Sequence, residues 1–297
     1  MLINASNIQN LFFGFSAAFQ QGWDGATSQY SRFCLDVPSQ TSENEYAWLG
    51  QFPGMREWLG DRLIKNLRAH SYTIKNKNFE STVSVNRNNI EDDRYGVYGP
   101  IFRALGEEAA THPDKLVYGL MSEGTVQTCY DGKPFFSTEH PVIVDNKAQK
   151  VSNLLQPESS EGPAWYLLCT TRAMRPFIFQ KRREYKLVAL DKENDENVFF
   201  RNEYLYGIDA RVNAGYGLWQ LAVCSTFGLD ADSYAAARST MASYIADNGK
   251  KLGIVPDLLV VPSELEKDAR LLLNCEQINS SSNPWHGSAE LLVSPWL

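Results

Sequence analysis

The chain has 297 residues, of which 43% are hydrophobic and 12% aromatic, enough to build a substantial core over about two domains. Its formal net charge of −7 argues against a dedicated nucleic-acid-binding protein, which normally carries a basic excess. Five cysteines without a CxxC pair make a disulfide framework improbable, and they are expected to be reduced core residues. The N-terminus lacks a secretory signal and no apolar run approaches the roughly 20 residues of a membrane span, so folding in a cytosol is expected.

The first 46 residues predict a short helix followed by an extended arm. Glycines, Pro38 and segments rich in serine, threonine and asparagine interrupt any regular pattern after the helix. The helix presents five apolar side chains at helical spacing: Ile8, Leu11, Phe12, Phe15 and Phe19. A short isolated helix is marginal in water, so this face must be covered. It caps its own domain or it contacts a neighbouring molecule, and the pattern leaves both alternatives open.

Strands are predicted at residues 46–50 and 71–75, with a surface excursion between them. The excursion is rich in turn formers but also carries large side chains: Phe52, Met55, Trp58, Leu59 and Arg62. A surface loop with an apolar tip is a candidate for burial against a partner, and tryptophan and arginine are enriched at interface hot spots. The alternative is that Trp58 folds back onto its own domain.

The clearest strand covers residues 79–86, where apolar and polar side chains alternate. An acidic turn at 90–93 provides carboxylates for a helix start, and an apolar stripe then predicts a helix over residues 94–123. Pro113 interrupts the stripe, so a bent rod of two segments is expected. At 1.5 Å per residue the rod is roughly 45 Å long, which suits an extended, flat molecule.

The remaining chain is first rich in strands and then mixed. Residues 125–130 are strand-like, 135–142 form a short aromatic segment, and 145–163 are expected to be a polar loop. Four strands are then predicted, at 165–169, 177–180, 185–190 and over a long run at 198–223. A helix from Asp230 to about 247, a buried strand at 256–262, a helix at 263–273 with a capping box of Ser263 and Glu266, and a last strand at 289–294 complete the chain.

Patterns of catalytic chemistry are weak. The four histidines do not occur at the spacing of a metal motif: His70, His112, His140 and His286. The GxSxG, GxGxxG and GxxxxGK[ST] motifs do not occur. The basic run at 181–183 is interpreted as a solvated turn or a partner for acidic neighbours, with nucleic-acid contact as the alternative. No catalytic residue, metal site or cofactor is predicted.

Ten short motifs, in order along the chain, resemble the Mu-type phage major head subunit (T protein) family of HK97-fold capsid proteins. They are YAWLGQ at 46–51, REW at 56–58, YTIKN at 72–76, FE at 79–80, IEDD at 90–93, YGVY at 95–98, CYDG at 129–132, HP at 140–141, DLLVVP at 257–262 and ELLVSP at 290–295.

The resemblance implies an α+β fold of the HK97-like capsid type. Its expected parts are an N-terminal arm at 1–45, an extended loop at 46–78, a peripheral domain at 79–227 with a spine helix at 93–123, an α/β axial domain at 228–290 and a C-terminal tail at 291–297. The domain of the strand-rich block at 164–226 stays open, because in many HK97-fold chains the axial domain directly follows the spine.

The resemblance also implies a function, that of the major capsid protein of a Mu-like tailed phage or prophage. Hexamers and pentamers of the chain would form an icosahedral shell around double-stranded DNA, which they contact weakly and without sequence specificity. Separate scaffold, protease, portal and decoration proteins are expected partners, with assembly in the bacterial cytoplasm and no membrane contact. The expected inter-subunit contacts are Phe52, Met55, Trp58, Leu59, Arg62, Phe12, Phe15 and Phe19.

Two other interpretations stay open at the sequence level. An encapsulin-like compartment would share the fold and store protein cargo. A soluble α/β enzyme would gather His140, Cys129 or acidic residues in one deep pocket.

Overall fold

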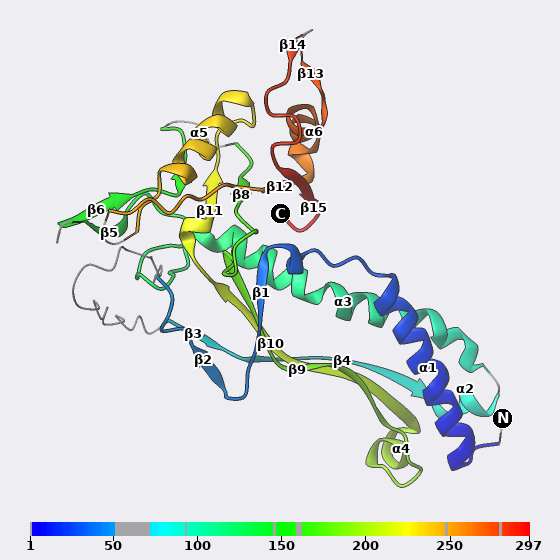
Figure 1. Cartoon of the computed structure of the whole chain (residues 1–297). Helices are drawn as coiled ribbons and strands as arrows, with labels where there is room; N and C mark the ends of the chain where they lie inside the picture. The colour runs from blue at the N-terminus through cyan, green and yellow to red at the C-terminus, as the bar shows by residue number, and fades with distance from the viewer. Residues whose placement is uncertain are drawn as a thin grey trace.

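Two β-sheets organise the chain in the computed structural model, which describes residues 2–50, 72–92, 94–144, 147–158, 162–246, 249–278 and 281–297 (Figure 1). The first sheet has the strand order β1-β9-β10-β4 and the second the order β15-β12-β8-β11-β7. The strands of the first sheet are β1 (Cys34–Pro38), β4 (Lys77–Asn86), β9 (Phe177–Leu190) and β10 (Glu203–Tyr216).

Strands β9 and β10 form a long antiparallel hairpin at the centre of the first sheet. Strand β4 pairs antiparallel with β10 and β1 pairs parallel with β9. Alternate residues of β10, from Tyr204 to Val212, are buried, so one face of the sheet is covered and the other is more open. The predicted strand at 79–86 is confirmed within β4, with Val85 fully buried.

Helix α1 (Ala5–Gly25) packs along α3 (Gly99–Ser122) on the covered face. The Asn4 side chain caps α1 by accepting a hydrogen bond of 2.9 Å from the Asn7 amide. The apolar face of α1 is therefore covered by the rest of the same chain, which is the first of the two alternatives that the sequence left open.

The predicted rod is one helix, and the expected interruption at Pro113 is wrong. Helix α3 continues through Pro113, with buried side chains from Phe102 to Met121 on both sides of it. Proline removes one backbone hydrogen bond, and burial of the continuous stripe outweighs that loss.

The helix also starts later than expected. The segment before it forms α2 (Arg87–Glu91) and the 3-10 helix η2 (Tyr95–Tyr98). Glu91 pairs with Arg87 inside α2, and α3 has no side-chain cap, so the predicted role of the acidic turn as its cap is wrong among the described residues.

The second sheet consists of β7 (Leu154–Leu155), β8 (Trp165–Leu168), β11 (Ala222–Ser225), β12 (Leu258–Pro262) and β15 (Glu290–Ser294). Every residue of β8, β11 and β12 is buried, as expected of a sheet that is covered on both faces. Helices α5 (Ala231–Ser243) and α6 (Glu266–Asn274) accompany this sheet. Asp230 caps α5 in a capping box with Ser233.

The strand-rich block at 164–226 is divided between the two sheets. Strands β8 and β11 belong to the second sheet and β9 and β10 to the first. Strand β15 pairs parallel with β12, so the C-terminal segment is also part of the second sheet. The division into a peripheral and an axial domain stays a prediction. In any such division, β8 and β11 would go with the second sheet, and β9 and β10 with the first.

The remaining elements are short. Three antiparallel pairs are formed by β2 (Glu43–Glu45) with β3 (Thr73–Lys75), β5 (His140–Val144) with β6 (Lys147–Val151), and β13 (Gln277–Ile278) with β14 (Ser281–Ser282). The short helices are η1 (Tyr30–Arg32), η3 (Glu123–Thr125), η4 (Trp219–Leu221), η5 (Ser263–Leu265) and α4 (Glu196–Arg201).

Several local predictions are wrong. Residues 46–50 are mainly turn. The predicted strand at 125–130 is instead the end of η3 followed by turns, a bend and a single bridge from Thr128 to Pro134, and the expected polar loop at 145–163 contains β6 and β7. The run at 198–223 begins as helix α4, whose Asn197 side chain bonds both flanking strands. Residue Ser263 starts η5 and makes no cap for α6.

The buried apolar residues form two clusters. The larger surrounds the second sheet and the near ends of β9 and β10. The second, smaller cluster lies among α1, the first half of α3 and the far end of the β9–β10 hairpin. All five cysteines are free and four are buried, as predicted, with Cys275 half-buried. Among the described residues, no helix combines the length and apolarity that crossing a bilayer requires.

Candidate functional site

The predicted contact residues of the N-terminal helix lie against the chain's own second cluster. Phe15 and Phe19 are only 4% and 7% exposed. The Phe15 ring stacks on Phe102 at 4.2 Å between centroids and meets Tyr206 edge-on at 5.1 Å. Phe12 is half-buried over Tyr206 at 6.2 Å. In this structure these side chains attach α1 to its own subunit.

The other five predicted contacts are Phe52, Met55, Trp58, Leu59 and Arg62. They lie outside the described residues.

Asp114 on α3 holds the segment that follows α1. Its carboxylate accepts hydrogen bonds from the Tyr30 amide at 2.7 Å, the Gln29 amide at 2.9 Å and the Ser28 hydroxyl at 3.1 Å. Burial raises the pKa of Asp114, and these donors partly offset that rise. The role of Asp114 was not predicted from the sequence. An aspartate directly after Pro113 is ordinary in the first turn of a helix, and the sequence predicted a new helical segment there.

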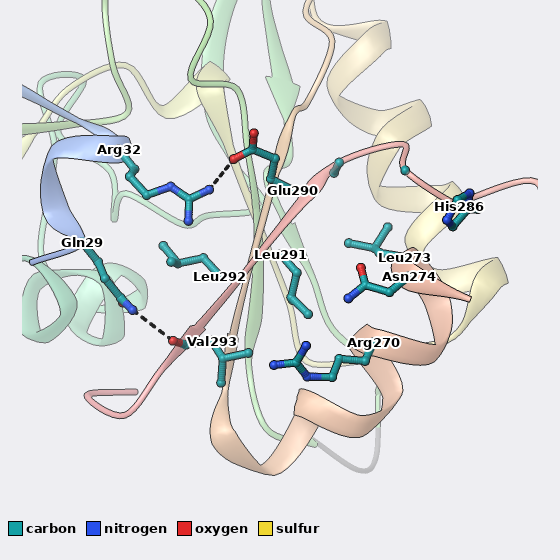
Figure 2. A pocket seen from close by; sticks show the side chains of 12 residues that line it. Gln29, Arg32, Arg270, Leu273, Asn274, His286, Glu290, Leu291, Leu292 and Val293 are labelled. Atoms are coloured by element: carbon teal, nitrogen blue, oxygen red, sulfur yellow. Dashed lines mark hydrogen bonds and ion pairs between the residues drawn. The ribbon is translucent and has the colours of Figure 1, made fainter. Parts of the chain in front are cut away.

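A cavity of about 670 Å³ lies beside strand β15, between η1 and α6 (Figure 2). Arg32 of η1 pairs with Glu290 of β15 at its rim. The Gln29 side chain accepts a hydrogen bond from the Tyr118 hydroxyl at 2.7 Å and donates one to the Val293 carbonyl at 3.4 Å. The cavity therefore marks the joint where the N-terminal segment meets the second sheet.

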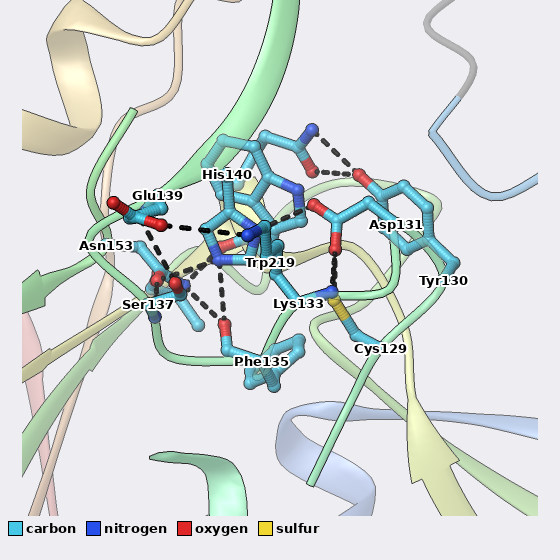
Figure 3. Close-up of polar contacts among 12 residues, drawn as sticks. Cys129, Tyr130, Asp131, Lys133, Phe135, Ser137, Glu139, His140, Asn153 and Trp219 are labelled. Carbon is cyan, nitrogen blue, oxygen red and sulfur yellow. Dashed lines mark hydrogen bonds and ion pairs between the residues drawn. The ribbon is translucent and has the colours of Figure 1, made fainter. Parts of the chain in front are cut away.

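A buried polar cluster joins Cys129, Asp131 and His140 (Figure 3). The Cys129 thiol donates to Asp131 Oδ1 at 3.2 Å, and His140 Nδ1 lies 2.7 Å from Asp131 Oδ2. The His140 side chain is 0% exposed and that of Asp131 is 6% exposed. The cluster closes the turn between η3 and β5.

The surroundings of His140 complete this network. Its Nε2 lies 3.2 Å from the Phe135 carbonyl and 3.1 Å from Asn153 Oδ1, and its ring stacks on Trp219 at 4.0 Å. Asn153 Oδ1 accepts from the Ser137 amide, which fixes the orientation of the amide group. Acceptors lie within hydrogen-bonding distance of both ring nitrogens, so the ring is held on two sides.

The electrostatics of the cluster do not suit a nucleophile. Burial, followed by the charge of Asp131, raises the pKa of the Cys129 thiol, whereas a reactive cysteine needs a lowered pKa. Burial also opposes the charge on Asp131, but its hydrogen bond and ion pair with His140 outweigh burial and lower the pKa of the carboxyl.

The cluster also offers three potential metal ligands within 4.8 Å of one another. A structural zinc site normally takes four ligands, and all three groups here already have hydrogen-bond partners. The enzyme interpretation expected these residues in a deep pocket. They do converge, but they line neither the cavity beside β15 nor a second cavity of about 340 Å³, which Trp23 and Tyr185 line. The arrangement is that of a structural hydrogen-bond network.

The basic run at 181–183 faces acidic side chains of the same sheet. Lys181 Nζ lies 2.8 Å from Asp36, and Arg183 pairs with Asp209. This bears out the interpretation of the run as a partner for acidic neighbours.

Comparisons with known proteins agree with this description. The profile of the family described as Mu-like prophage major head subunit gpT matches residues 8–297. The major capsid protein of Escherichia phage Mu is 42% identical over 305 aligned residues, spanning 100% of both chains.

The chain belongs to the Mu-like prophage major head subunit gpT family.

Solved structures of related phage shells show the same α+β, HK97-like fold. A chain of the bacteriophage JBD30 procapsid superimposes on this gpT family member with a TM-score of 0.88 and 41% identity, covering 99% of this chain and 100% of that one. The JBD30 capsid decorated with minor capsid protein trimers gives a TM-score of 0.74 and 31% identity, covering 92% of this chain and 91% of that one. This gpT family member is a major capsid protein and a component of the virion shell.

Proposed function

We propose that this head subunit assembles with copies of itself, as hexamers and pentamers, into an icosahedral shell that encloses packaged double-stranded DNA. The observation that carries the proposal is the 42% identity with the phage Mu major capsid protein over the full length of both chains. Closed symmetry lets many modest contacts add up to a stable container.

The extended loop supplies the anchors of this assembly, through Phe52, Trp58 and Leu59 with Met55 and Arg62 beside them. Large aromatic and arginine side chains dominate interface energetics when a partner buries them. The N-terminal helix contributes Phe12 at its half-buried surface, while Phe15 and Phe19 hold that helix against its own subunit.

Separate scaffold, protease and portal proteins complete the head in this proposal, and a minor capsid protein decorates it as in the JBD30 structure. Contact with DNA is weak, because the net charge is −7 and basic side chains such as Lys181 and Arg183 are engaged with carboxylates. The shell needs no enzymatic step from this subunit, and the buried thiol of Cys129 suits a structural role.

Expression of the chain, alone and with its head-assembly partners, followed by negative-stain electron microscopy, tests the proposal. Closed shells that protect DNA from nuclease when all partners are present are the expected result. Particles filled with protein cargo, or a subunit that stays monomeric with every partner, would contradict it.

Deletion of residues 52–61 tests the role of the loop separately. A variant with wild-type circular dichroism that forms no shells is expected. Normal shells from this variant would refute the role of the loop and leave the capsid function intact.

A further inference from the structure

Two neighbouring phenylalanines stand exposed at the far end of the β9–β10 hairpin. Phe199 and Phe200 on helix α4 are 80% and 75% exposed, and their rings meet edge-on at 5.0 Å. Figure 1 shows α4 at the tip of this hairpin, projecting away from the second sheet. Single exposed apolar residues are ordinary, but a paired aromatic surface at a projecting tip indicates an interaction site.

Helix α4 is held firmly in this position. The Asn197 side chain donates to the Leu190 carbonyl at 3.0 Å and to the Glu203 carbonyl at 2.7 Å, so it joins the ends of both strands. Val198 is 5% exposed within the second cluster. Because successive helical residues turn by about 100°, burial of Asn197 and Val198 directs the next two side chains outward.

The neighbouring sheet surface is also apolar. Val188 and Leu190 are 48% and 49% exposed, whereas Leu187 between the covering helices and the sheet is buried. Of the thirteen large apolar side chains that are exposed in the described part of the chain, seven lie on the elements around the second cluster, and Leu2 precedes the first of these elements. This end of the subunit therefore carries most of the exposed large apolar side chains that the structure describes.

The charges around α4 are acidic on balance. The segment at 191–203 carries five carboxylates and two cations: Asp191, Glu193, Asp195, Glu196, Glu203, Lys192 and Arg201. The absence of a net positive charge among them disfavours DNA as the occupant.

We propose that Phe199 and Phe200 form an inter-subunit contact, in which helix α4 docks on a second copy of this chain. The inference rests on the proposed shell assembly, because a shell surrounds each subunit with copies of itself. The backbone of the tip is already ordered, so association restricts only the side-chain rotamers of the two rings, and burial of their apolar area stabilises the contact.

The double variant F199S/F200S tests the contact in subunits assembled together with the head-assembly partners, with V126S/V255S as the matched control. The control residues are 77% and 64% exposed and lie outside this end of the subunit. Both variants should keep the circular dichroism and thermal unfolding of the wild type. The F199S/F200S subunits should need a concentration at least about tenfold higher to form shells, since burial of each ring is worth a factor of ten or more in association.

Two outcomes overturn the inference in different ways. Wild-type subunits that never form shells would overturn the proposed function together with this contact. Wild-type shells accompanied by equal assembly of F199S/F200S would overturn the contact alone.

A photo-crosslinking amino acid at position 200 of assembled wild-type shells identifies the occupant. Covalent dimers of this chain are expected. Crosslinks only to a minor capsid protein, or none, would overturn the assignment of a second copy.

Discussion

The close contact between helices α1 and α3 predicts that Gly106→Ala destabilises the subunit. A Cβ at Gly106 would lie 2.0 Å from the Phe19 carbonyl oxygen, and one at Gly22 would lie 1.9 Å from the Arg103 carbonyl oxygen. The two glycines therefore let the backbones of the helices approach each other directly. The same approach places Phe15 against Phe102.

The expected loss in the free energy of unfolding follows from two opposing effects of Gly106→Ala. The helices must separate locally by roughly 1.4 Å to restore ordinary contact, and a gap of about 1 Å already forfeits up to half of the dispersion energy. The facing carbonyl belongs to a helix backbone and cannot rotate away, so the cost lies at the upper end of the usual range for overpacking, about 3 kcal/mol. Alanine gains about 1 kcal/mol over glycine inside a helix, so the free energy of unfolding should fall by about 2 kcal/mol.

Urea denaturation and amide hydrogen exchange of unassembled subunits measure this effect. A loss of 2 kcal/mol corresponds to exchange that is about 30-fold faster for the amides of α1. Gly119→Ala is the matched control, because Gly119 lies in the same helix and a Cβ there meets no atom within 4 Å. This control should raise the free energy of unfolding by about 0.5–1 kcal/mol.

A Gly106→Ala variant as stable as the wild type would refute the close backbone contact between α1 and α3. Equal destabilisation by Gly119→Ala would refute it as well, because the effect would then come from α3 itself and not from the contact with α1.

Three further predictions concern buried polar groups. The folded pKa of Asp131 is lowered, so its stabilisation is present above the unfolded value of about 4 and is lost as the pH falls through the folded pKa. Urea midpoints measured from pH 5 to pH 3 should therefore fall less steeply in Asp131→Asn than in the wild type, and equal slopes would contradict the ion pair. Asp114→Ala leaves the amides of residues 29 and 30 without their acceptor and should lower the free energy of unfolding by about 2–4 kcal/mol, whereas Glu107→Ala on the exposed face of α3 should change it by less than about 0.5 kcal/mol. Alkylation followed by mass spectrometry should label Cys275 first, and equally rapid labelling of Cys129 would show that the polar cluster is accessible.

Elements with a strong local period were predictable from the sequence. The strand at 79–86 and the N-terminal helix each carry apolar residues at one spacing, and the continuous apolar runs of β8 and β12 have the short length of buried strands. The ordered motifs of the gpT family likewise identified the fold and the capsid function before any contact was known.

Features that depend on how the chain turns between short segments could not be predicted in this way. The pair of histidine and cysteine in the polar cluster offered no recognisable spacing, and only the turn between η3 and β5 brings His140 to Asp131. Helix α4 was mistaken for a strand because a run of two phenylalanines beside valine fits either period, and Asn197 selects the helix by bonding both flanking strands.

The sequence by itself determined the family, the main strands and the apolar face of the first helix, because these follow from the local spacing of side chains. Only the tertiary structure decided that this face is covered by the same subunit. The backbone contact at Gly22 and Gly106 joins two helices that are far apart in the chain. The tertiary structure also decided that Phe199 and Phe200 remain exposed, since burial of their neighbours on α4 depends on the strands and helices packed around them.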